Sequence, residues 1–562
     1  MEKHYYFDRN LLALSAYNDA LCKRLSAAET TLSRYRFVES RNGNAIPAWV
    51  DATGAAHTLH SLIAPEREAE RFCSTLTEEG YLVLLGLGGG YFAEAVLERD
   101  TTHKILVIDY DIHAIAELFC SCEYVHILND PRVTLLVDPD VHTIINYIIE
   151  TYHPCVHNGI RLIPLRGRCD FDEEHFLPAA DAVKQAIDLV SSDYSVQAHF
   201  GMRWFSNIIR NVVLAEKQHG IIAPVSHAAV CAAGPSLDIQ LNELKKRREE
   251  LFIISTDTAL GALLSAGIVP QALISIDCQH ISYLHFMCQG IAALREHTTL
   301  FVDLASPPLL ALSLPKSFFF SGGHPLVRYI TSNFKEFITL DTSGGNVTYA
   351  GIALAEKLGA KTIELYGADF AYPDGMAYSK GAYFYPFLNR LQNRFSPVSA
   401  QLAGFLFNIP SLRYVKCAHD YYYETRSLEM YRKRLEEKAQ NSNACFIAMP
   451  GKGAPIQFPV RPNVTRPFDT TIKLFSGGRT FTGAKNFLSV YRRNIAELPV
   501  PERNIESYFQ QLSASERTIF TTFLPTAAAL KQRKAIKEND VLFHAVKSFC
   551  TEKIDKVLKS AY

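Results

Sequence analysis

Short apolar runs that end in glycine or acidic residues recur along the chain. In the first part of the sequence, Tyr81–Leu85 runs into the glycine turn 86–90, a helical pattern follows, and 104–108 runs into Asp109. A strand, a glycine turn, a helix and a second strand ending in an acid are typical of a Rossmann-type domain. We therefore predict an α/β domain over 61–165. The further strands expected in it are 124–128, 132–137 and 161–164.

A second series of short apolar runs begins near residue 227 and alternates with helical patterns. This alternation favours a parallel, doubly wound sheet, in which ligands bind at the carboxyl ends of the strands. The predicted strands are 228–232, 251–255, 272–276, 299–304, 317–320, 362–366 and 413–417.

The predicted fold class is α/β, with two Rossmann-like parallel-sheet domains and a mainly helical C-terminal domain. A helical pattern connects the two sheet domains, and prolines and glycines cluster after the second one, as is typical of a linker. The expected parts are an N-terminal flank (1–60), a Rossmann-like domain (61–165), a helical connector (175–220), a catalytic α/β domain (221–440), a linker (441–467) and a helical C-terminal domain (468–562).

Composition narrows the function classes. The 562 residues include 57 Lys and Arg against 58 Asp and Glu, so no basic field indicates a nucleic-acid partner. The 12 cysteines are scattered without a C-x-x-C, which is typical of reduced thiols in a cytosolic protein. We see no signal peptide and no membrane-spanning segment, and therefore expect a cytoplasmic protein.

Two motifs lie at predicted strand ends in the second α/β region. After the strand at 228–232, Gly234, Pro235 and Ser236 lead into a helix, and N–H groups and a hydroxyl at a helix start suit a phosphate. An ordinary strand-to-helix turn is the alternative. The next two strands end in Asp257 and Asp277, whose carboxylates could bind sugar hydroxyls or a divalent ion. Helix capping is the alternative role for these acids.

Two further motifs follow. Residues 342–346 open a helix, and the strand after it ends in Gly367 and Asp369, with Tyr372 and Tyr378 downstream. Paired glycines let the backbone close on a ligand, whereas the tyrosines could simply pack. His419 could serve as a general base. The residues that open the helix are Thr342, Ser343, Gly344, Gly345 and Asn346.

The glycine turn 86–90 with Asp109 about twenty residues on resembles the nucleotide-binding opening of S-adenosylmethionine methyltransferases. A Rossmann scaffold without a cofactor is the alternative, and it is the one we favour.

The motifs at 234–237, 257–260, 275–277, 342–344 and 367–369 occur together and in order, and this combination resembles the motility-associated flagellin glycosyltransferase family (Maf). The resemblance covers about 60–440. The central pattern is also similar to bacterial sialyltransferases that use CMP-activated sugars. That resemblance implies that the turn at Gly234–Ser236 and the start at 342–344 hold the nucleotide, that Asp369 lies in the donor site, and that Tyr372 and Tyr378 assist the departing phosphate. The catalytic base is not fixed by it.

The resemblance implies a glycosyltransferase that moves a nonulosonic, sialic-acid-like sugar from a CMP donor to Ser or Thr of flagellin. The expected partners are flagellin and the CMP-activated sugar, with no nucleic acid. No cofactor is required, although Asp257, Asp277 and Asp369 leave Mg²⁺ as an option. A related archaeal family with the same motifs transfers pyrophosphate to a hydroxymethylpterin, so a pyrophosphokinase stays an alternative. A non-catalytic flagellin-binding protein is another.

Overall fold

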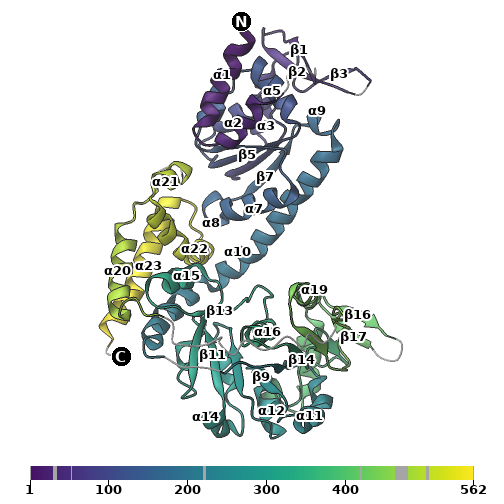
Figure 1. The fold of residues 1–562 in the computed structure, drawn as a ribbon, viewed down its shortest axis with the longest axis vertical. Helices are drawn as coiled ribbons and strands as arrows, with labels where there is room; N and C mark the ends of the chain where they lie inside the picture. Colours follow the sequence, from purple (N-terminus) through teal and green to yellow (C-terminus); the bar gives the residue numbers. More distant parts are fainter. Residues whose placement is uncertain are drawn as a thin grey trace. The chain divides into compact units, whose positions relative to one another are not determined.

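The computed structural model describes residues 2–28, 34–51, 53–218, 223–417, 421–461, 479–501 and 505–560. The chain divides into two compact units. Figure 1 traces the chain from its N-terminus to its C-terminus. The first unit comprises 1–201, 498–520 and 524–548, and the second comprises 202–497, 521–523 and 549–562.

The first unit contains a parallel sheet in the order β6-β5-β4-β7. Its inner strands β4 and β5 are buried along their whole length, which explains their unbroken apolar sequences. The strand order reverses between β4 and β7, as in a Rossmann-like domain. The predicted fold class is confirmed here. The strands are β4 (Tyr81–Leu85), β5 (Lys104–Asp109), β6 (Val133–Val137) and β7 (Ile160–Pro164).

One strand predicted in this unit is wrong. Residues 125–129 form the short helix α6 (Val125–Asn129) instead of a strand at 124–128. A five-residue apolar run does not distinguish a buried strand from a buried helical turn. Long-range hydrogen bonds hold Tyr124 just before this helix: its N–H donates to Asn10 Oδ1 at 2.7 Å, and its hydroxyl donates to the Gly88 carbonyl at 2.6 Å.

Helices and a small antiparallel sheet surround the parallel sheet of the first unit. The antiparallel sheet is β1 (Tyr35–Glu39), β2 (Ala45–Val50) and β3 (Ala56–Thr58). The helices α1 and α2 pack against α5, so the N-terminal flank belongs to the same core. The helices are α1 (Glu2–Ser15), α2 (Asp19–Ser26), α3 (Pro65–Cys73), α4 (Tyr91–Leu97), α5 (Ile112–Ser121), α7 (Val141–Thr151), α8 (Pro154–His157) and α9 (Arg166–Cys169).

The second unit is built on a larger sheet whose described strands are all parallel, in the order β13-β12-β11-β10-β9-β8-β14-β18. The order reverses between β8 and β14, and this switch point is where α/β sheets of this kind bind ligands. The strands are β8 (His227–Cys231), β9 (Phe252–Thr256), β10 (Ala272–Ser275), β11 (Thr299–Asp303), β12 (Ser317–Ser321), β13 (Ile338–Thr339), β14 (Thr362–Tyr366) and β18 (Cys445–Ala448).

Two segments of the second unit differ from the sequence-based expectation. The strand at 413–417 forms, as Arg413–Lys416, but it belongs to a small antiparallel sheet in the order β15-β17-β16 and not to the parallel sheet. The edge strand β18 lies within the segment 441–467 that we expected as a linker. The small sheet is β15 (Tyr372–Pro373), β16 (Arg413–Lys416) and β17 (Tyr421–Glu424).

Helices cover both faces of the large sheet. The helix α16 packs against β8, β9 and β10, and its residues 349–355 are all buried. The helices are α11 (Leu237–Lys246), α12 (Leu260–Ser265), α13 (Ser282–His285), α14 (Leu294–His297), α15 (Pro325–Asn333), α16 (Val347–Lys357), α17 (Phe384–Leu391), α18 (Val398–Phe407) and α19 (Arg426–Asn441), with 3₁₀ turns at Ile291–Ala293 and Pro308–Leu310.

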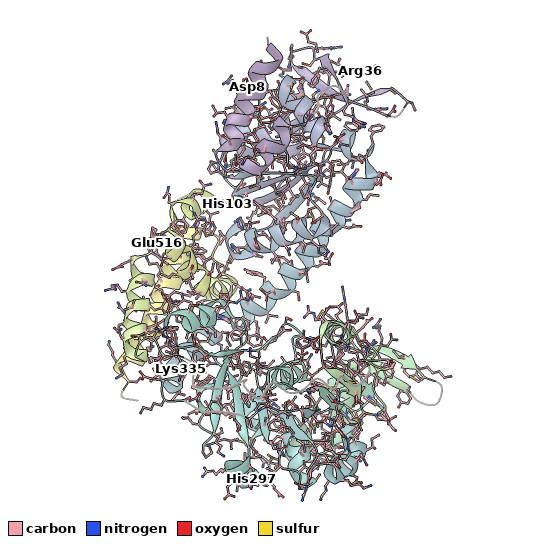
Figure 2. The ribbon with its side chains drawn as sticks, in the orientation of Figure 1. Asp8, Arg36, His103, His297, Lys335 and Glu516 are labelled. Atoms are coloured by element: carbon pink, nitrogen blue, oxygen red, sulfur yellow. The ribbon has the colours of Figure 1, made fainter. Side chains whose placement is uncertain are left out.

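The long helix α10 (Glu173–Ala215) runs where the helical connector was predicted. Lys335, labelled in Figure 2, is buried, and its ammonium donates to the carbonyls of Ala215 and Gln218 at 2.8 and 2.6 Å. A cation at this position stabilises the C-terminal end of α10. Among the described residues, no helix is long and apolar enough to cross a membrane. The C-terminal helices are α20 (Ala484–Glu497), α21 (Ile505–Gln511), α22 (Ala514–Lys534) and α23 (Asn539–Lys559).

Candidate active site at the carboxyl edge of the large sheet

The glycine turns after β8 and β14 meet at the switch point of the large sheet. The N–H of Gly234 donates to the carbonyl of Gly367 at 2.9 Å. A β-carbon on Gly234 would collide with the carboxylate of Asp369, so the close approach requires glycine. Gly367 has φ of +61° and Phe370 has φ of +45°, which is a strained value for a bulky residue. Two predicted binding motifs, 234–236 and 367–369, are therefore brought together.

Asp369 acts as the anion at the start of α11. Its carboxylate accepts a hydrogen bond from the Ser236 N–H at 2.8 Å, and both residues are buried. Burial raises the pKa of Asp369, while the hydrogen bonds from Ser236 oppose this shift. Although Ser236 directly precedes α11, its side chain makes no capping hydrogen bond to that helix. The carboxylate takes the place that a phosphate would occupy at a helix start.

The segment after β18 closes over this turn. The Ser236 hydroxyl accepts a hydrogen bond from the Lys452 N–H at 2.7 Å, and the Ala454 N–H donates to the Asp369 carbonyl at 2.9 Å. Buried Gln240 joins the same contact, because its amide donates to the Pro450 carbonyl and its oxygen accepts from the Gly367 N–H. We call residues 449–454 the covering segment.

The acids at the ends of β9 and β10 lie next to the switch point. Asp257 is buried, and its carboxylate accepts hydrogen bonds from the Ser275 hydroxyl and the Thr258 N–H, both at 2.7 Å. Asp277 is half-buried and accepts from the Gln279 N–H at 2.9 Å. In the part of the chain that the structure describes, no three acidic, histidine or cysteine side chains gather closely enough to hold a metal ion.

Tyr378 lies on a loop that hydrogen bonds hold against the end of β8 and the start of α11. The Ser379 N–H donates to the Ala233 carbonyl at 2.8 Å, and the Ser379 hydroxyl donates to Asp238 at 2.6 Å. Burial raises the pKa of Tyr378, and the negative charge of Asp257 raises it further. The phenol therefore stays protonated at neutral pH. Its hydroxyl has no hydrogen-bond partner among the described residues, so it is free to donate to a ligand.

The neighbours of Tyr378 are aromatic. Burial and the nearby Tyr378 raise the pKa of Tyr372, which places the two predicted tyrosines near each other. Tyr383 was not singled out from the sequence, yet burial together with the charges of Tyr378, Asp257 and Asp277 raises its pKa to about 12. The ring of buried His285 packs against Tyr383 with 4.4 Å between the ring centres. His419, the base suggested by the sequence, lies outside the described residues.

Asp303, at the end of β11, is an acid that the sequence analysis missed. It is buried, and its carboxylate accepts from the Ala305 N–H at 2.7 Å. Burial raises its pKa to about 7, although backbone N–H groups of Ala305 and Gly322 hold the pKa down. The Thr342 hydroxyl donates to the Gly322 carbonyl at 2.8 Å, which ties the predicted motif at 342–346 to this acid. The sequence pattern that could have identified Asp303 is an acidic residue at the end of an apolar strand.

The raised pKa of Asp303 predicts a pH dependence of stability. The folded state holds this proton more tightly than the unfolded chain, whose carboxyl titrates near pH 4. The free energy of unfolding should therefore fall as pH rises from about 4 to about 7. Asp303→Asn should remove this slope and stabilise the second unit at pH 8 by at most about 4 kcal/mol, since the pKa difference is about three units and one unit corresponds to about 1.4 kcal/mol.

Hydrogen exchange of peptides from β10 and β11 in urea, at pH 5 and pH 8, measures this effect. Glu296→Gln is the control, because Glu296 is exposed and should change neither value. An Asp303→Asn protein with the parental pH dependence would show that Asp303 is ionised throughout this range.

The remaining residues of the motif at 342–346 build the start of α16. Asn346 caps the helix by accepting from the Tyr349 N–H at 2.9 Å, and Ser343 donates through its N–H and hydroxyl to Asp341. A β-carbon on Gly344 would collide with the Tyr349 ring, and Gly345 has φ of +77°. The side chains of Ser343 and Asn346 thus shape the turn, and their predicted role in nucleotide binding stays a prediction.

A polar groove of about 620 Å³ lies beside this turn, between α16 and α19. Arg434 donates to the Ser343 carbonyl at 2.9 Å, and Lys438 pairs with Asp341 and Glu356 at 3.3 and 3.0 Å. Although burial raises the pKa of Asp341, hydrogen bonds from Ser343 and Tyr349 bring it down to about 2. The groove therefore carries charges of both signs next to a predicted nucleotide-binding residue.

In the first unit, the space beside the glycine turn 86–90 is occupied by a side chain of the protein, His60. The Gly89 N–H donates to His60 Nε2 at 2.9 Å, and a β-carbon on Gly88 would meet the same atom at 2.6 Å. Asp109 is fully buried; it accepts from the Leu87 and Tyr110 N–H groups and faces Arg168 at 3.4 Å. The acid that would bind a ribose is thus occupied, which favours the scaffold interpretation.

Comparison with known proteins supports this architecture. The structure of the MAf glycosyltransferase from Magnetospirillum magneticum AMB-1 aligns with 99% of this chain and 96% of its own, with a TM-score of 0.63 and 13% sequence identity. The chain has the fold of a Maf glycosyltransferase. The resemblance that the motifs indicated is therefore confirmed for the fold, and it extends from the Maf-like α/β domains to the C-terminal helices.

The other comparisons match shorter stretches of this chain. The model of the family described as "6-hydroxymethylpterin diphosphokinase MptE-like" matches residues 203–375. Two uncharacterized proteins of Treponema pallidum (strain Nichols) are similar in sequence. One is 29% identical over 161 residues, which are 28% of this chain and 77% of that protein; the other is 30% identical over 119 residues, which are 21% of this chain and 42% of that protein.

Proposed function

We propose that this protein is a glycosyltransferase that moves a nonulosonic sugar from a CMP-activated donor to Ser or Thr hydroxyls of flagellin. The likeness to the Maf glycosyltransferase over nearly the whole of both chains is the observation that carries the proposal. The acids and phenols at the carboxyl edge of the large sheet support it, because they lie where α/β sheets bind ligands.

The chemistry assigns separate tasks to these groups. The acceptor oxygen attacks the anomeric carbon, the bond from that carbon to the phosphate oxygen breaks, and CMP leaves with the electron pair. Tyr378, protonated at neutral pH and without a partner of its own, donates to the oxygen on which charge develops. To Asp277, half-buried and near Tyr383, we assign the contact with the positively charged sugar or its hydroxyls. The acceptor proton passes to a base, for which His419 stays our prediction.

Ser236 should influence donor binding through the covering segment. Ser236→Ala removes the acceptor of the Lys452 N–H and should release residues 449–454 from the turn. We expect CMP binding to weaken by roughly 1–2 kcal/mol, the cost of a lost hydrogen bond to a buried group. Calorimetry with CMP measures it, and Ser313→Ala, which removes an exposed hydroxyl, is the control. Unchanged CMP affinity in a folded Ser236→Ala protein would place the nucleotide elsewhere.

A pterin pyrophosphokinase is the second candidate, because the MptE-like family model matches residues 203–375. That reaction uses ATP and needs Mg²⁺ to neutralise the transferred phosphates. Calorimetry separates the two candidates. CMP binding without Mg²⁺ supports the glycosyltransferase, whereas ATP binding that requires Mg²⁺, with no CMP binding, supports the pyrophosphokinase.

A further inference from the structure

The helices α17 and α18 and the segments next to them leave several large apolar side chains exposed. Only Leu388 of α17 and Leu406 of α18 are buried, and α18 carries no charged residue. Phe395, between the two helices, is 93% exposed. Soluble proteins rarely leave such a cluster open unless something binds it. We name it the α17–α18 surface; its exposed members are Phe387, Leu391, Phe395, Phe405, Phe407 and Tyr414.

Ring contacts connect this surface to the candidate active site. The Phe384 ring lies 5.1 Å from that of Phe405 on the surface and 5.4 Å from that of Tyr378 in the site. On the other side, Phe407 contacts Tyr423 at 5.3 Å, and Tyr423 contacts Tyr414 at 5.7 Å. A molecule seated on α17 and α18 would therefore lie close to Tyr378, the phenol that we propose acts on the leaving phosphate.

The charge of the surface has one sign. Residues 384–417 contain Arg390, Arg394, Arg413 and Lys416 but no aspartate or glutamate. Arg413 pairs with Glu424 and Glu429, whereas no ion pair of the other three is found in the described part of the chain. A second copy of this chain, using the same face on both partners, would bring these cations against each other. These charges disfavour a symmetric contact between two copies and favour a different molecule with negative charge as the occupant.

The composition favours a polypeptide over a lipid surface. Aromatic side chains and arginine are the residues enriched at the centres of protein interfaces, and here they outnumber lysine. We infer that the α17–α18 surface binds the acceptor polypeptide through an apolar segment flanked by acidic residues, and so holds its hydroxyl near Tyr378. This inference rests on the proposed transfer to a protein and names the surface that selects that protein.

Flagellin purified from a strain that lacks this gene is the probe. The variant Phe395→Ser/Phe407→Ser should lower flagellin affinity at least tenfold and raise the KM for flagellin, with CMP affinity unchanged. Leu12→Ser/Leu177→Ser, which alters exposed leucines of the first unit, is the matched control and should keep the parental affinity. Arg390→Glu/Arg394→Glu should also weaken binding and should reduce its dependence on salt.

Several results would overturn the inference. One is parental flagellin affinity in the Phe395→Ser/Phe407→Ser protein, and another is a parental protein that binds no flagellin. Binding of the parental protein, but not the variant, to phosphatidylglycerol vesicles would assign the surface to a membrane. A parental dimer that the variant converts to a monomer would assign it to self-association. Flagellin binding that depends on this surface, without any sugar transfer, would leave the inference standing and contradict the proposed function instead.

Discussion

Arg168→Met should destabilise the first unit by about 3–5 kcal/mol, because it leaves the Asp109 charge buried without its ion-pair partner. The side chains of both residues are fully buried, and Arg168 also pairs with Asp172 at 2.9 Å. Its guanidinium lies 4.0 Å from the centre of the Trp49 ring. A loss of this size is a large part of the stability of a typical domain.

The double variant Asp109→Asn/Arg168→Met is the matched control. Replacing both charges removes the unpaired ion, so it should regain part of the stability that the single variant loses. Hydrogen exchange of peptides from β4 and β5 in urea measures the first unit separately from the second. A single variant with parental exchange would show that the pair contributes nothing to this unit.

Tyr378→Phe should lower the rate of sugar transfer on the order of 10²-fold, the usual effect of removing one hydrogen-bond donor from a developing negative charge. Because the charge on the leaving phosphate grows in the transition state, kcat should fall while donor affinity changes little. The variant keeps the ring, so its packing against Phe384 should survive. Tyr372→Phe should act in the same direction.

Tyr385→Phe is the control for disturbance of the loop, because the Tyr385 hydroxyl donates to the backbone carbonyl of Tyr378 at 3.1 Å. We expect it to change the rate much less than Tyr378→Phe. Single-turnover rates with CMP-nonulosonate and flagellin, together with CMP affinity, give the comparison. A parental rate in the Tyr378→Phe protein would remove this residue from the chemistry.

Apolar runs predicted the inner strands of both parallel sheets well, because these strands are buried on both faces. The same reasoning failed at 124–128, where a short apolar run became a helix held by Asn10, more than a hundred residues away. It also did not reveal β18, because Cys445–Ala448 precedes prolines and glycines that are typical of a linker.

The candidate site shows the same limit. Asp257, Asp277 and Asp369 could be proposed from the sequence, since the ends of parallel strands meet at one edge. The Ser236 N–H donates to Asp369, 133 residues away, and the Lys452 N–H donates to Ser236, 216 residues away. No local sequence pattern indicates such long-range hydrogen bonds. The roles of Asp303 and Tyr383 likewise depend on burial, which only the folded chain defines.

The intact mass of flagellin, with and without the gene for this protein, tests the central claim most directly. We predict that flagellin from the parental strain is heavier by whole multiples of one nonulosonic acid residue, and that deletion of the gene removes this increment. Restoring the gene with Tyr378→Phe should return little of it. Flagellin of identical mass in the parental and deletion strains would contradict the account.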